Sequence, residues 1–235
     1  MMRRHSSGAT DAASMPVLDI DGARATIRLN RPKHLNRLQP EDLDALVRLF
    51  DRIEADPALR VLVLTGTGRA FSSGYDLGSI AERTANAQEQ AAGSAFEIVV
   101  NRLEDLALPT ICRLNGGVYG GATDLALACD FRTGVDNAKR LFLTAEKIGA
   151  PEMLRIGYLT AMVPAEALDQ EVDQLAGILA GNAPAAMRGM KRTINEFARN
   201  RLDEEAADRR HRDSMRSAEM REGVKAFAEK RPPKF

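Results

Sequence analysis

The sequence has little of several residue types on which common functions depend. It has no tryptophan, and its 33 basic residues balance its 33 acidic residues. This balance predicts no polyanionic partner such as nucleic acid, although a local basic patch for a small anion remains possible. The two cysteines, Cys112 and Cys129, lie in apolar runs and indicate core residues in a reducing compartment. The three histidines and two cysteines lie far apart and have no zinc-ligand spacing, so we expect no metal site.

Long apolar runs are also absent. No stretch approaches the roughly 20 apolar residues that a membrane helix needs, so we expect no membrane partner. Residues 1–15 are polar, carry Arg3 and Arg4, and lack the apolar centre of a secretory signal. An arginine- and serine-bearing start is also typical of transit peptides, but this one is short and contains Asp11. We therefore expect a disordered N-terminal tail on a cytoplasmic protein.

The remaining pattern predicts strands and helices in one full-sized domain. Residues 17–29 alternate apolar and polar side chains around Asp21-Gly22, which predicts a hairpin. Pro40 opens a helical pattern that ends before Asp56-Pro57. Residues 61–64 form a continuous apolar run, typical of a strand buried on both faces in a parallel sheet.

A strand, a glycine-containing turn and a helix then follow one another twice. The strand at 61–64 leads into the turn 70–77, and a second strand at 110–114 leads into the turn 115–121 and a short apolar helix. This repetition predicts an α/β architecture. From Pro164 the pattern is helical, ending in a charged stretch from 202 to about 229. Its apolar stripe is weak, so we expect it to pack on the body or on a neighbouring subunit.

The two glycine turns predict a ligand site because each follows a presumed parallel strand, and ligands collect at the carboxyl ends of such strands. Glycine lets backbone N–H groups approach a ligand closely, and Gly120-Gly121 stands at a helix start. One N–H from each turn would hold a carbonyl oxygen that becomes an oxyanion, each donor being worth about 3 kcal/mol. The same glycines also fit turns that merely bend tightly. Asp124, in the first helical turn, fits either a dipole-complementing acid or a carboxylate at the oxyanion site.

Five segments, in this order, resemble motifs of the enoyl-CoA hydratase/isomerase (crotonase) family: 27–36, 70–77, 115–132, 143–158 and 226–232. The resemblance covers nearly the whole chain. It implies a crotonase-like spiral of repeated ββα units over 16–182. It also implies a C-terminal α-helical trimerisation region over 183–235, and hence a homotrimer or a hexamer built from two trimers.

The resemblance assigns roles to particular residues. The N–H groups of Tyr75 and Gly121 fall at the oxyanion-hole positions, and Asp124 falls where hydratases carry their first catalytic glutamate. The following residues fall where the family contacts coenzyme A: Ser73, Gly74, Tyr75, Asp76, Leu77, Phe227 and Lys230. Without the family, Lys230 would be interpreted as a solvated tail charge.

The sequence departs from the family after Arg132. Relatives carry a second catalytic carboxylate there, but here the chain runs almost directly into Lys139-Arg140, and roughly thirty residues, a large piece of one α/β unit, are missing near 138–139. Either the given sequence omits a segment, which we favour, or the protein lacks it. Glu146 aligns with a variable position and is expected to be a surface residue.

The resemblance implies an acyl-CoA enzyme that takes a coenzyme A thioester as substrate and holds no permanent cofactor. We predict enoyl-CoA hydratase, the addition of water to a 2-enoyl-CoA through a stabilised enolate. Enoyl-CoA isomerisation, which needs only one base, and a non-catalytic acyl-CoA-binding homologue remain alternatives.

Two other classes fit less well. A serine peptidase on a related spiral fold would use Ser72 or Ser73 and need a positioned histidine, but His5, His34 and His211 lie in distant segments. A dinucleotide fingerprint beginning at Gly66 fails because Phe71 occupies the third glycine position.

Overall fold

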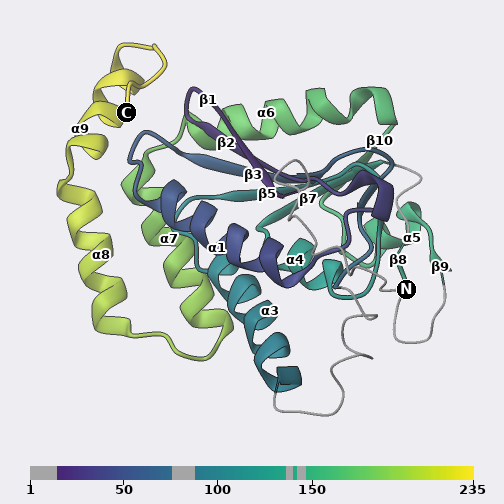
Figure 1. The fold of residues 1–235 in the computed structure, drawn as a ribbon. Helices are drawn as coiled ribbons and strands as arrows, with labels where there is room; N and C mark the ends of the chain where they lie inside the picture. Colours follow the sequence, from purple (N-terminus) through teal and green to yellow (C-terminus); the bar gives the residue numbers. More distant parts are fainter. Residues whose placement is uncertain (1–14, 76–87, 136–139, 142–146) are drawn as a thin grey trace, which may run out of the picture.

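The computed structural model describes residues 15–75, 88–135, 140–141 and 147–235 (Figure 1). Several predicted features lie outside these residues: positions 1–14 of the tail predicted at 1–15, Asp76, Leu77, the predicted missing segment near 138–139 and Glu146. None of the helices described is both long and apolar enough to cross a bilayer.

A six-stranded sheet forms the centre of the molecule. Its order is β1-β2-β3-β5-β7-β10, and only the β1–β2 pair is antiparallel. The strands are β1 (Val17–Asp21), β2 (Arg24–Leu29), β3 (Val61–Gly66), β5 (Thr110–Leu114), β7 (Phe131–Val135) and β10 (Ala161–Val163). The predicted hairpin and the predicted parallel strand are therefore confirmed. Every residue of β3 is buried, as expected of a strand covered on both faces.

Helices cover both faces of this sheet. In Figure 1, α6 (Leu168–Ala180) runs along one face, and α1 (Pro40–Glu54), α3 (Gln88–Glu104) and α4 (Ala122–Ala128) lie on the other. The apolar stripe of α1 lies in the main core, where Leu46 and Phe50 are fully buried. The shorter helix α5 (Ala150–Arg155) precedes β10. The predicted α/β architecture with a helical C-terminal region is confirmed.

A second, smaller sheet carries the loops that follow the main strands. Its order is β4-β6-β8-β9, formed by β4 (Ala70–Ser72), β6 (Gly117–Val118), β8 (Arg140–Leu141) and β9 (Lys147–Ile148). The parallel β4–β6 pair joins the start of the predicted turn 70–77 to the middle of the predicted turn 115–121. This pair brings together two segments more than forty residues apart in the sequence.

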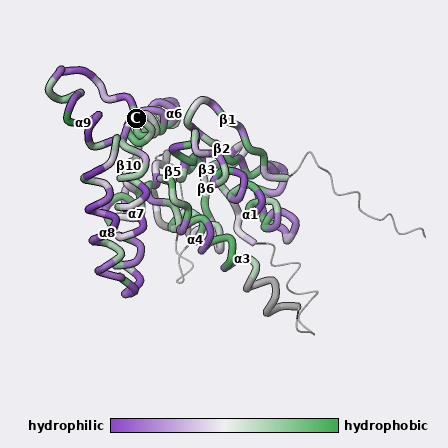
Figure 2. The backbone as a smooth tube through the Cα atoms, turned by 90° about the vertical axis from the view of Figure 1, so that its left-hand side faces the viewer, coloured by the Kyte–Doolittle hydropathy of each residue, from purple (hydrophilic) through white to green (hydrophobic). Residues whose placement is uncertain are grey.

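Three helices complete the chain on one side of the body: α7 (Pro184–Ala198), α8 (Glu204–Arg216) and α9 (Ala218–Ala228). The sequence predicted one charged stretch from 202 to about 229, but two helices are present. The break falls at Ser217, whose hydroxyl accepts a hydrogen bond from Met220 N at 3.0 Å and so caps α9. Figure 2 shows that α8 is mostly hydrophilic, in contrast to the central strands.

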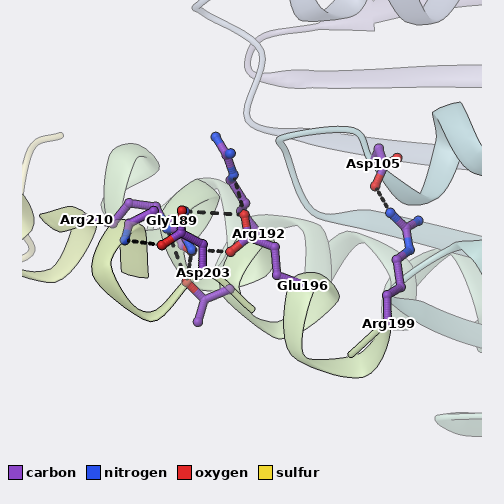
Figure 3. A network of polar contacts seen from close by, with 9 residues as sticks. Asp105, Gly189, Arg192, Glu196, Arg199, Asp203 and Arg210 are labelled. Carbon is purple, nitrogen blue, oxygen red and sulfur yellow. Dashed lines mark hydrogen bonds and ion pairs between the residues drawn. The ribbon is translucent and has the colours of Figure 1, made fainter. Parts of the chain in front are cut away.

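Polar contacts join the C-terminal helices to one another and to the body. Glu196 on α7 accepts from Arg192 on the same helix and from Arg210 on α8, and Arg199 reaches Asp105 after α3 (Figure 3). Lys191, only 9% exposed, donates to Asp130 at 2.8 Å. α7 therefore docks on the body through an ion pair whose lysine is buried and whose aspartate is 25% exposed.

Candidate active site

Hydrogen bonds to the buried residue Asn36 hold the first loop of the candidate site, which follows β4. Asn36, 1% exposed, donates from its side chain to the carbonyls of Thr67 and Ala70, both at 2.9 Å. The fully buried Ser72 hydroxyl donates to the Asn36 carbonyl at 2.7 Å and accepts from Gly74 N at 3.1 Å. These bonds fix the backbone from the end of β4 to Gly74.

Asn115 joins the second loop to the same framework. Its side chain donates to the carbonyls of Gly68 and Ala70 at 2.7 and 3.0 Å and accepts from Gly66 N at 3.0 Å. Neither Asn36 nor Asn115 was predicted as part of the site. The available signal was Asn115 at the start of the second glycine turn, because an amide side chain can satisfy several turn backbone groups at once. Asn36 lies 34 residues before the first turn, so no local signal connected it to that turn.

The two predicted loops meet at Gly74 and Gly121. Gly74 has φ +87°, and a Cβ placed on it would lie 2.7 Å from Tyr119 O and 3.1 Å from Gly121 N. Only glycine fits there without displacing backbone. The N–H of Tyr75, the next residue, therefore lies in the neighbourhood of the N–H of Gly121.

Neither of these N–H groups donates to an acceptor among the hydrogen bonds of the described residues. The bridge between Leu38 and Tyr75 is made by a hydrogen bond from Leu38 N to Gly74 O, at 2.9 Å, and does not use Tyr75 N. Among the hydrogen bonds of the described residues, none has Gly121 N as donor. Two adjacent N–H groups from separate segments can together bind one carbonyl oxygen, and they stabilise it more as it becomes negative.

Helix α4, which begins after Gly121, is anchored at its other end by Arg132. The guanidinium donates to Cys129 O at 2.5 Å and to Tyr158 O at 2.7 Å. A cation at a helix C-terminus stabilises the helix. Next to it, Asp130 accepts from Thr110 N at 2.7 Å and from Lys191. The position of α4 is thus fixed by β5, α7 and the chain after α5.

Asp124 lies on the exposed side of α4. Its N–H donates to Gly121 O at 3.0 Å, which places it one helical turn beyond the second loop. Its carboxylate has no hydrogen bond or ion pair with another described residue, so it remains available to exchange a proton. Leu127, one turn further, is 46% exposed and lies on the same outward side.

An aromatic pair flanks the two N–H groups. A Cβ on Gly121 would lie 3.0 Å from the Cζ atom of Phe96, so this ring on α3 lies directly against Gly121. The rings of Phe96 and Tyr75 pack tilted, with centroids 6.3 Å apart and planes at 54°. Both side chains are half-buried. The sequence placed Phe96 only on the apolar face of a helix and missed its contact with Gly121.

The predicted coenzyme A contacts are not all brought together in one chain. Ser73 and Gly74 lie in the first loop. Phe227, 88% exposed, and Lys230 lie on or just after α9, which is well separated from α4 (Figure 1). Within one chain these two positions are therefore far from the loops.

The alternative site types find no support in the same region. The Ser72 hydroxyl is buried against Asn36, and the Ser73 hydroxyl donates to the backbone oxygen of His34 at 3.3 Å rather than to its ring. No hydrogen bond of the described residues joins either serine to an imidazole. In the same residues, no group of three or more histidine, cysteine, aspartate or glutamate side chains is placed to hold a metal ion.

The mainly parallel α/β core defines the fold class of this protein, and comparison with known proteins agrees. The sequence profile of the enoyl-CoA hydratase/isomerase family matches residues 19–139 and 132–235. The chain belongs to the enoyl-CoA hydratase/isomerase family. The family predicted from the sequence is confirmed.

Individual relatives agree with this assignment. A putative enoyl-CoA hydratase of Thermus thermophilus is 29% identical over 247 residues, covering 91% of this chain and 98% of the relative. The 1,2-epoxyphenylacetyl-CoA isomerase of Escherichia coli is 30% identical, over 89% of this chain and 94% of the relative. A solved enoyl-CoA hydratase/carnithine racemase of Magnetospirillum magneticum is 26% identical and matches with a TM-score of 0.89 over 94% of each chain. The fold is therefore the crotonase fold, as predicted.

The match to the family profile has two parts, and the division falls after Arg132, where the sequence departs from the family. Its two parts meet at residues 132–139. The alignment with the Thermus relative runs over 247 positions, more than the 235 residues of this chain, so that relative carries residues with no counterpart here.

Proposed function

We propose that this protein acts on an acyl-CoA thioester by stabilising its enolate between the N–H groups of Tyr75 and Gly121. The observation that carries the proposal is the meeting of the two loops, with Gly74 against Gly121 N and neither N–H group donating to another described residue. Donors that are already oriented stabilise the developing oxyanion without reorganising during the reaction. Each contributes about 3 kcal/mol to transition-state stabilisation.

Enoyl-CoA hydration is the first reaction to test. Relatives named hydratases include the crotonyl-CoA hydratase of Syntrophomonas wolfei, 27% identical. In this reaction Asp124 would hold the attacking water or return a proton to the α-carbon. An aspartate is one methylene shorter than a glutamate, which withdraws its carboxylate by roughly 1.5 Å from where a glutamate would reach.

Double-bond isomerisation is the second candidate, and a specific observation favours it. Hydration in this family calls for two carboxylates, whereas moving a proton between two carbons of an enolate needs only one base. The family match divides where relatives carry the second carboxylate, and Asp124 is the carboxylate one turn beyond the N–H pair. A homologue that binds acyl-CoA without turnover is the remaining outcome.

One assay separates these reactions. The full chain would be tested with crotonyl-CoA for hydration and with 3-hexenoyl-CoA for isomerisation, with Asp124→Ala and, as control, Asp44→Ala, an exposed position on α1. If Asp124 is the acid/base, Asp124→Ala loses at least about 100-fold in kcat and still binds coenzyme A, while Asp44→Ala keeps its activity. Unchanged turnover in Asp124→Ala would remove this residue from the mechanism.

We also propose that the chain assembles as a homotrimer or a pair of trimers through its C-terminal helices, and acts in the cytoplasm. Apolar side chains recur on α7 and α9 at i, i+4 and i+7 and are 38–88% exposed: Met190, Ile194, Phe197, Met220, Val224 and Phe227. A groove of about 340 Å³ between these helices is lined mostly by apolar residues. A neighbouring subunit would cover this surface and bring its own Phe227 and Lys230 toward the loops, where they would contact coenzyme A.

A further inference from the structure

The Tyr75–Phe96 pair is distinctive because the chain is poor in aromatic residues. Only 5% of the residues are aromatic, and none is tryptophan. Two of these few rings nevertheless meet beside the N–H pair, with Phe96 against Gly121 and Tyr75 contributing the other N–H. Phe50 and Phe71 are fully buried in the core, whereas both rings of this pair are half-buried and the hydroxyl of Tyr75 is itself covered.

The geometry of the pair suits a third ring. Aromatic rings prefer tilted or offset contacts with centroids 4.5–7 Å apart, and the pair at 6.3 Å and 54° is one such contact. A thioester oxygen held by Tyr75 N and Gly121 N brings its acyl group alongside these rings, because Phe96 touches Gly121 itself. The two half-buried rings would then lie beside the first carbons of the acyl chain.

We propose that Phe96 and Tyr75 form a specificity surface for an aromatic acyl group, so that the preferred substrates are aryl-substituted acyl-CoA thioesters rather than straight-chain ones. This inference rests on the proposed use of the N–H pair to hold the thioester. Phe96 is the determining ring. Its contact adds selectivity for a flat π-system over an aliphatic group of equal size, because ring quadrupoles attract one another beyond simple burial of apolar surface.

Equilibrium binding of two unreactive thioesters tests the proposal without depending on the reaction. Phenylacetyl-CoA and cyclohexylacetyl-CoA have acyl groups of nearly equal size, and only the first carries a π-system. By isothermal titration calorimetry on the full chain, we expect phenylacetyl-CoA to bind about tenfold more tightly, the factor that corresponds to the upper range of an aromatic pair. Equal affinities would overturn the proposal.

Variants assign the preference to the ring of Phe96. Phe96→Leu keeps an apolar side chain and should bring the two dissociation constants within about twofold. Tyr75→Phe keeps the ring and should retain the phenyl preference. Phe131→Leu, the same change at a half-buried ring on β7, is the matched control and should also retain it. A preference that survives Phe96→Leu, or that Phe131→Leu removes equally, would overturn the assignment.

This design separates failure of the inference from failure of the proposed function. If phenylacetyl-CoA, cyclohexylacetyl-CoA and free coenzyme A all fail to bind, the acyl-CoA function itself is wrong. If both thioesters bind with equal affinity, the acyl-CoA function stands and the aromatic preference is wrong. Circular dichroism and thermal unfolding of each variant verify that any lost preference does not come from lost structure.

Discussion

The body and the C-terminal helices use apolar side chains in opposite ways. On α1, Leu46 and Phe50 are fully buried in the main core. On α9, Val224 is 58% and Phe227 88% exposed. Burying such a side chain contributes about 1.5–3 kcal/mol, so the body obtains its stability from its own chain. The apolar stripes on α7 and α9 contribute nothing comparable until another surface covers them.

Polar contacts add to the packing of Met187 where α7 meets the body. Lys191 donates to Asp130 and to Leu108 O, and Asn195 donates to Glu104 O. Such contacts are directional and fix α7 at one angle on the body. The difference teaches that the body folds on its own buried core and carries the candidate site. The C-terminal helices are instead positioned by directional polar contacts and leave an apolar surface exposed.

The largest expected effect belongs to the body, at Gly74. Gly74→Ala would put a Cβ 2.7 Å from Tyr119 O at a φ of +87°, so the loops must move apart. Loss of one oxyanion donor costs about 100- to 1000-fold in rate, and we expect kcat to fall by at least 100-fold on the best substrate in a steady-state assay.

Gly157→Ala is the control for this change. Gly157 has a similar φ of +76°, but a Cβ there would meet nothing within 4 Å. The control should lose about 1 kcal/mol of stability and keep its rate constant. If the two variants lost activity equally, the convergence of the loops would not be what the reaction needs.

The next effect lies at the junction of the two regions. Lys191→Met would remove a charged hydrogen bond from Asp130, which is 25% exposed and keeps its bonds from Thr110, so we expect a loss of about 1.5–3 kcal/mol. Arg192→Met, one residue along α7, breaks a pair whose arginine is 69% exposed and should cost less than about 1 kcal/mol. Urea unfolding of both variants measures the difference. Similar losses would mean that the junction does not depend on burial of Lys191.

The sequence predicted the body better than the junction, for physical reasons. The alternating pattern at 17–29 and the apolar run at 61–64 identified the first strands, because the burial of a strand can be predicted from the local spacing of its apolar residues. The two glycine turns were predicted to lie together because consecutive parallel strands end at the same edge. The strand positions depend on residues close together in the sequence, and the meeting of the turns depends on the regular order of strands in a parallel sheet.

The contacts between distant segments were not predictable in this way. Phe96 against Gly121, and Lys191 against Asp130, join residues 25 and 61 positions apart through side-chain packing. Helical periodicity placed Phe96 on an apolar face, but it does not say what that face touches. The break at Ser217 was missed because the charged residues on either side continue one helical pattern, although a serine is a favoured N-cap.

A smaller effect on folding, but a clear one on assembly, is expected on α9. Val224→Asp puts a charge in the exposed stripe, so the stability of the single subunit should change by no more than about 0.5 kcal/mol. If the stripe is a subunit interface, sedimentation velocity should record a lower mass than for the wild type. Lys225→Asp introduces the same side chain off the stripe and should leave the mass unchanged. An identical mass for all three proteins would show that this face is not the interface.

The smallest effect concerns the tail that folds back on α9. Hydrogen bonds from Arg231 and from Lys234 N lower the pKa of Glu222 from 4.5 to about 2. A carboxylate whose pKa is lower in the folded state stabilises the fold above its unfolded pKa, and this contribution is lost as pH falls from about 4.5 towards 2. Glu222→Gln cannot ionise, so its urea midpoint should lie slightly below that of the wild type at pH 6. At pH 3 the two midpoints should lie closer together. A difference equally large at both pH values would mean that the Glu222 charge does not hold the tail, and that the tail, like the rest of the C-terminal region, is placed by other contacts.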